Sequence, residues 1–155
     1  MSASIQFARI PHLIEQQYAA EQQFLQQFAA GSYTPQTPLI IINPYIIAPL
    51  TALVMFQTEQ ALAVRLKVCG REAAGDLHVS FPAATLHYIP VYGLYGDALN
   101  TISLTLSDGS VYTHTLQTDP LPELVKSVTA IQTSSEYFGT DLMFVSPTSK
   151  AYAAG

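Results

Sequence analysis

From residue 39 onward, turn-forming residues divide the chain into short apolar segments, and this pattern limits the fold more than any other feature. The clearest segment is 62–68, in which leucine and valine alternate with alanine, arginine and lysine. Side chains of a strand point alternately to its two faces, so this segment has one buried and one solvated face. Such segments at close spacing are typical of an antiparallel β-sandwich or barrel. We therefore expect everything after residue 39 to be β-structure.

The chain before residue 39 has helical periodicity and predicts one α-helix over residues 11–30. Apolar side chains recur there at the spacing of one helix face, namely Ile14, Tyr18, Leu25 and Phe28, with Leu13 and Phe24 beside them. Pro11 suits a first helical turn, and Gly31 suits the position after the last turn. The predicted fold class is therefore an all-β antiparallel sandwich preceded by one amino-terminal α-helix.

One expected hairpin, over residues 100–116, turns at Asp108-Gly109. A two-residue turn would align Val111 with the apolar face of the preceding strand. A three-residue loop with Gly109 at positive φ would align His114 with that face instead. We favour the three-residue loop because it matches apolar residues with apolar residues. It predicts that His114 packs beside Ile102.

The composition indicates that a partner covers part of the surface. The 155 residues are 49% hydrophobic and 11% charged, whereas soluble domains have about 25% charged residues. Large exposed apolar patches are uncommon on monomers, so a second copy or another domain would cover such a surface. Tyr88, Tyr92 and Tyr95 are the candidate interface residues, because tyrosine is enriched at interfaces. Core packing explains these three residues equally well.

Several classes of function do not fit the sequence. The formal net charge is −5 and the six basic residues are scattered, so we expect no nucleic-acid partner. The most apolar run, 39–56, is broken by Asn43, Pro44 and Pro49, so we expect no membrane span. Cys69 is the single cysteine, and the amino terminus has no basic cluster followed by an apolar core. We therefore expect neither an internal disulfide nor a secretion signal in this sequence.

We also expect no catalytic, cofactor-binding or metal-binding residues. The four histidines are His12, His78, His87 and His114, and none lies at the spacing of a metal motif. No Gly-x-Ser-x-Gly sequence occurs, and the glycine pair at 93 and 96 lacks the following helix that a phosphate loop needs. Each histidine is interpreted as structural or solvent-facing.

Residues 43–54 resemble a known family. The amino-terminal domain of bacterial aryl-sulfate sulfotransferases carries the motif Asn/Asp-Pro-Tyr-x-x-Ala-Pro-Leu-Thr-Ala-Leu, and this chain reads Asn43-Pro44-Tyr45-Ile46-Ile47-Ala48-Pro49-Leu50-Thr51-Ala52-Leu53-Val54. Residues 64–71, 89–95, 100–109 and 138–142 resemble further stretches of the family, so that the resemblance extends from 39 to the end. The chain departs from the family at Ile46-Ile47, where a polar or glycine-containing pair is usual, and at Cys69-Gly70-Arg71.

The resemblance implies an immunoglobulin-like sandwich that is a non-catalytic module of a larger enzyme. The family transfers a sulfuryl group from a phenolic sulfate ester to a phenol through a sulfohistidine, with its catalytic residues in a β-propeller and no cofactor. None of those catalytic residues maps onto this chain. We expect a helical arm at 1–34, a sandwich at 35–133, and a linker into the propeller at 134–155. The implied partners are the chain's own propeller and a second copy, in the periplasm or cytoplasm of a bacterium.

Two other functions stay open. The first is a free-standing immunoglobulin-like module that binds a ligand or protein at Tyr88, Tyr92 and Tyr95, because one fold hosts many functions. The second is an independent small enzyme. It would need a deep pocket that holds His78 or His87 beside a carboxylate.

Overall fold

The computed structural model describes residues 10–121, which form one long helix, a short 3-10 turn and five strands. The elements are α1 (Ile10–Ala30), β1 (Leu39–Ile42), β2 (Ala52–Val68), η1 (Ala73–Gly75), β3 (Leu77–Val91), β4 (Leu99–Leu106) and β5 (Val111–Gln117). The helix expected over 11–30 is confirmed. The end of the expected sandwich at 133 and the linker over 134–155 lie outside the described residues. Within residues 10–121, no helix is long and apolar enough to cross a membrane.

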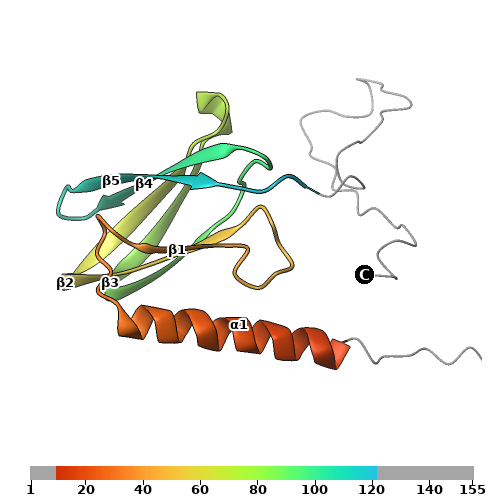
Figure 1. Cartoon of the computed structure of the whole chain (residues 1–155). Coiled ribbons are helices and arrows are strands. Elements are labelled where there is room, and N and C mark those ends of the chain that lie inside the picture. The colour runs from red at the N-terminus through yellow and green to blue at the C-terminus, as the bar shows by residue number, and fades with distance from the viewer. Residues whose placement is uncertain (1–9, 122–155) are drawn as a thin grey trace, which may run out of the picture. The chain divides into compact units, whose positions relative to one another are not determined.

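The long strands β2 and β3 join the two layers of the sandwich. β3 pairs antiparallel with β2 from Ala52↔Val91 to Val68↔Leu77, with register shifts between Gln57 and Val64. On its other side β2 pairs first with β1 and then with β4, and β4 pairs with β5. In Figure 1, β4 and β5 lie in the upper layer and β1 lies in the lower layer. One continuous antiparallel sheet therefore supplies both layers, and the predicted fold class is confirmed.

The main core lies between the two layers and follows the alternation of β2. Val54 and Phe56 point into it before the register shift, and Val64, Leu66 and Val68 point into it afterwards. Ile89 of β3 and Ile102 of β4 complete the same cluster. The segment 62–68 thus has the single buried face that its sequence predicts.

Helix α1 covers the outer face of the lower layer, as Figure 1 shows. Phe24 and Phe28 are buried and pack with Leu39 and Met55 in a second cluster. β1 and the start of β2 are therefore covered on both faces, which explains why residues 39–42 are continuously apolar. The predicted helix face is only partly buried, because Tyr18 is 63% exposed, and Leu13 and Ile14 are exposed with it.

The β4–β5 hairpin has the predicted three-residue loop. Gly109 has φ +90°, and Leu106 N–H donates to Ser110 C=O across the loop. Ile102 pairs with His114, whose Nε2 donates to Pro35 C=O at 2.9 Å. The prediction that His114 packs beside Ile102 is confirmed.

Candidate functional site

The loop between β1 and β2, residues 43–51, is held in shape by the asparagine that begins the 43–54 motif. Asn43 has φ +50°, a left-handed conformation that asparagine tolerates. Its Oδ1 accepts the N–H of Ala48 at 2.9 Å, and its own N–H donates to Thr51 C=O at 2.9 Å. Thr51 Oγ1 in turn donates to Ala48 C=O. These bonds close the loop at its base, and Ile46 and Ile47 are 65% and 58% exposed.

An apolar groove of about 400 Å³ lies between this loop, α1 and the end of β3. Its lining includes Pro44, Tyr45, Ile47, Leu53, Pro90 and Tyr92. Tyr45 OH donates to Glu21 Oε1 at 3.3 Å. Partial burial, followed by the nearby charge of Glu21 and this hydrogen bond, raises the pKa of Tyr45 above its ordinary value. The lining contains no histidine, cysteine, lysine or carboxylate, so it suits apolar contact better than acid-base chemistry.

The three candidate interface tyrosines have different neighbours. Tyr92 is 62% exposed and lines the groove. Tyr88 is 41% exposed on β3, and its ring centroid lies 5.8 Å from that of Phe28. Tyr95 is partly buried, accepts the N–H of Arg71, and has the Arg71 guanidinium 4.8 Å from its ring centroid. Tyr88 and Tyr92 thus keep exposed apolar surface, whereas Tyr95 is partly buried against Arg71.

The histidines of residues 10–121 differ in their surroundings, and His87 is the buried one. His87 is 2% exposed, stacks on Phe56 with ring centroids 4.5 Å apart, and hydrogen-bonds Thr58 Oγ1 through Nε2. Burial lowers the pKa of His87, although a hydrogen bond to the backbone of Ala84 opposes the shift. His12 and His78 are exposed. Among the described residues, no group of three or more His, Cys, Asp or Glu side chains could hold a metal ion.

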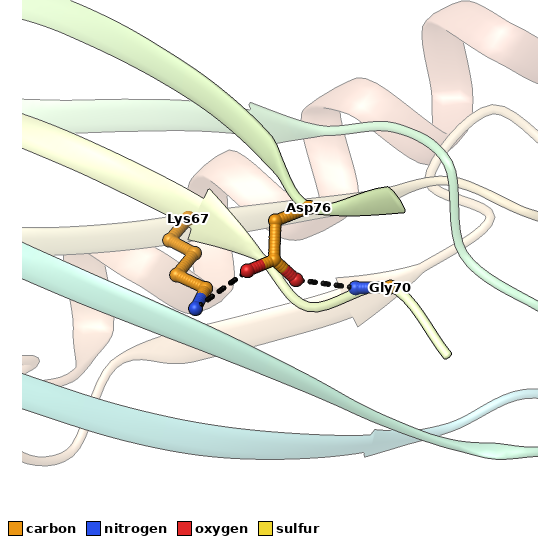
Figure 2. Close-up of polar contacts among 3 residues, drawn as sticks. All are labelled: Lys67, Gly70 and Asp76. Atoms are coloured by element: carbon orange, nitrogen blue, oxygen red, sulfur yellow. Dashed lines mark hydrogen bonds and ion pairs between the residues drawn. The ribbon is translucent and has the colours of Figure 1, made fainter. Parts of the chain in front are cut away.

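Figure 2 shows the polar contacts that fix the turn between β2 and β3. Asp76 Oδ2 lies 2.7 Å from Lys67 Nζ, and Asp76 Oδ1 accepts the N–H of Gly70 at 2.9 Å. The hydrogen bond from Lys67, then that from Gly70, lowers the pKa of Asp76, and the same pairing raises the pKa of Lys67. Neither group reaches the groove, so these contacts shape the turn.

A buried asparagine orders the chain around the start of β4. Asn100 is 4% exposed, its Nδ2 donates to the carbonyls of Tyr95 and Ala98 at 3.1 Å, and its Oδ1 accepts the N–H of Tyr95. The sequence placed Asn100 at the start of the expected hairpin, but no local pattern predicted that its side chain is buried and bonds the backbone. Its position after the turn residues Gly96 and Asp97 was the available signal.

A family model described as the arylsulfotransferase Ig-like domain matches residues 39–120. The match covers all five strands and the loop over 43–51, and it does not include α1. None of the curated proteins compared with the chain matches it.

Proposed function

This chain belongs to the family of arylsulfotransferase Ig-like domains, and from that premise we propose that it is the non-catalytic amino-terminal module of an aryl-sulfate sulfotransferase. The complete enzyme transfers a sulfuryl group from a phenolic sulfate ester to a phenol through a sulfohistidine in a β-propeller. The module supports that propeller and takes part in a homodimer. Residues 1–34 form its helical arm, 35–133 its sandwich, and 134–155 the link to the propeller.

The apolar rim of the groove, which Ile47 and Tyr92 form, supports this role most directly. Asn43 holds a loop whose tip presents Ile46 and Ile47 to solvent, and Tyr92 is exposed beside it. Exposed apolar residues that gather at a groove mark interaction sites. We propose that the propeller packs on this rim, with Tyr92 as one of its contacts.

Sulfuryl transfer tests the proposal. We would measure transfer from a chromogenic aryl sulfate to a phenol, in parallel on the 155-residue chain and on the full-length product of its gene. Activity only in the full-length protein supports a non-catalytic module. Activity in the 155-residue chain contradicts the proposal and directs attention to His78, His87 and His114.

Charge substitutions in the full-length protein test the packing surface. Ile47→Asp, at a 58% exposed position of the groove lining, should lower the melting temperature of the enzyme and its activity, because burial of an unpaired carboxylate against the propeller is costly. Leu99→Asp is the matched control, since Leu99 is 66% exposed and lies outside the groove lining. Equal effects of the two variants would contradict packing at the rim.

The groove also favours a second function, a free-standing module that binds a ligand. Its volume of about 400 Å³ falls within the range of small-molecule pockets, about 300–1,000 Å³. Absence of sulfuryl transfer in both proteins, together with saturable binding of an apolar probe that Tyr92→Ala abolishes, would favour this alternative.

A further inference from the structure

Strand β3 is an edge strand with little protection against pairing. Among residues 10–121 it pairs with β2 on one side and with no strand on the other. Its fifteen residues, Leu77–Val91, include no Asp, Glu, Lys or Arg. Natural edge strands usually carry charges, prolines or bulges that prevent pairing with another chain. On β3 the prolines are Pro82 and Pro90, and the register shifts against β2 lie between Phe81 and Leu86. Residues 86–89 carry none of these three devices.

The backbone of this window faces outward at two residues. Gln57 N–H donates to Tyr33 C=O, away from β3. Met55 lies two residues earlier in β2, so it directs its backbone groups to the same side as Gln57. In an antiparallel pair, the backbone N–H and C=O groups of two opposite residues either point toward each other or both point away. Leu86 is opposite Gln57, and Tyr88 is opposite Met55. Leu86 and Tyr88 therefore direct their N–H and C=O groups to the open edge.

The same two residues present apolar side chains beside that edge. Leu86 is 42% and Tyr88 is 41% exposed, and residues two apart in a strand lie on the same face. A twofold axis beside His87 places Leu86 of each copy opposite Tyr88 of the other. Each of these two pairs can exchange two N–H···O=C bonds, and the leucine and tyrosine side chains cover each other.

The absence of charge on β3 permits a second copy to occupy this edge. The chain has a net charge of −5, and like charges directly opposite each other destabilise strand pairs. β3 has no charged residue, so two copies can meet there without placing like charges across the axis. A twofold interface uses the same patch on both copies, as this pairing does.

We propose that the chain self-associates by antiparallel pairing of residues 86–88 of β3, centred on His87, with the same residues of a second copy. This pairing identifies the surface that forms the homodimer of the proposed function. It therefore rests on the self-association part of that function. It does not depend on sulfuryl transfer, which the activity assay tests separately.

Amide hydrogen exchange of the 155-residue chain, combined with its mass by sedimentation equilibrium, tests the pairing across a concentration series. The fraction of dimer should increase with concentration. Over the same range, the exchange rates of the Leu86 and Tyr88 amides should decrease about tenfold or more. Three results would overturn the proposal. These are a monomer at all concentrations, a dimer in which both amides exchange freely, and a monomer in which both amides are protected at every concentration.

Substitutions at Leu86 add an independent readout. Leu86→Pro removes an N–H that has no partner in the described part of the chain, and Leu86→Lys places two lysines near the axis. Each should weaken dimerisation about tenfold or more, with an unchanged circular dichroism spectrum. Leu99→Lys is the control, because Leu99 is also exposed but lies on β4. Unchanged dimerisation in a folded Leu86→Lys variant would contradict the proposal, as would an equal loss in the control.

Discussion

His87 makes the stability of this domain depend on pH. Burial against Phe56 lowers its pKa below the ordinary value of 6.5. The unfolded state therefore binds a proton at a higher pH than the folded state does. The contribution of neutral His87 to the free energy of unfolding is complete above pH 6.5, and it decreases as the pH falls from 6.5 through the folded pKa. We expect urea midpoints to decrease from pH 7.5 to pH 5.

Matched glutamine variants identify the residue responsible. His87→Gln removes the titrating group and should reduce this slope, whereas His78→Gln, at an exposed position, should keep it. Asp76 and Asp108 also have lowered pKa values, but their contributions are lost only below about pH 4. An unchanged slope between pH 7.5 and 5 in His87→Gln would contradict the assignment.

Asn100 stabilises the domain by satisfying several buried backbone groups. Asn100→Ala leaves the carbonyls of Tyr95 and Ala98 and the N–H of Tyr95 without this partner. Thr118 still donates to both carbonyls, so the N–H of Tyr95 is the group left unsatisfied. Such a group costs about 1–3 kcal/mol, and urea denaturation should show a loss within that range. Gln117→Ala, at an exposed position of β5, is the control and should change the stability by about 0.5 kcal/mol or less.

At the scale of single elements, the β4–β5 loop depends on a glycine conformation. Gly109 has φ +90°, and an added Cβ would meet no atom within 4 Å. The cost of Gly109→Ala is therefore a backbone cost, about 1–2 kcal/mol. Gly75→Ala is the control, because Gly75 has no positive φ and its nearest neighbour would lie at 3.6 Å. An equal free-energy loss in both variants would contradict this explanation.

The elements that the sequence predicted are those with local signals. The helix over 11–30 has Pro11 and Gly31 at its ends, and the β4–β5 register follows from Gly109. No local signal predicts that segments 51–56 and 62–68 belong to the single strand β2. Its polar middle, residues 57–60, stays extended because β3 pairs on both sides of it. The groove brings together Tyr45, Leu53 and Tyr92 through the fold, so no sequence spacing could predict it.

At the scale of the whole described domain, α1 is the cover of the lower layer. Leu39 and Met55 are 7% and 0% exposed under Phe24 and Phe28. The family match begins at residue 39 and does not include this helix, although the apolar outer face of β1 lies within the match. The chain therefore depends on a segment outside the matched region to bury a face inside it.

Deletion of residues 1–32 tests this dependence. We expect the shortened chain to lose about 3 kcal/mol or more of unfolding free energy and to bind a hydrophobic dye, because the face around Met55 becomes exposed. In the full chain, Phe28→Ala should cause a large part of the same loss. Tyr18→Ala, at a 63% exposed position of α1, should change the stability by about 0.5 kcal/mol or less. An undiminished stability after the deletion would mean that residues 1–34 are an arm without a structural role in the sandwich.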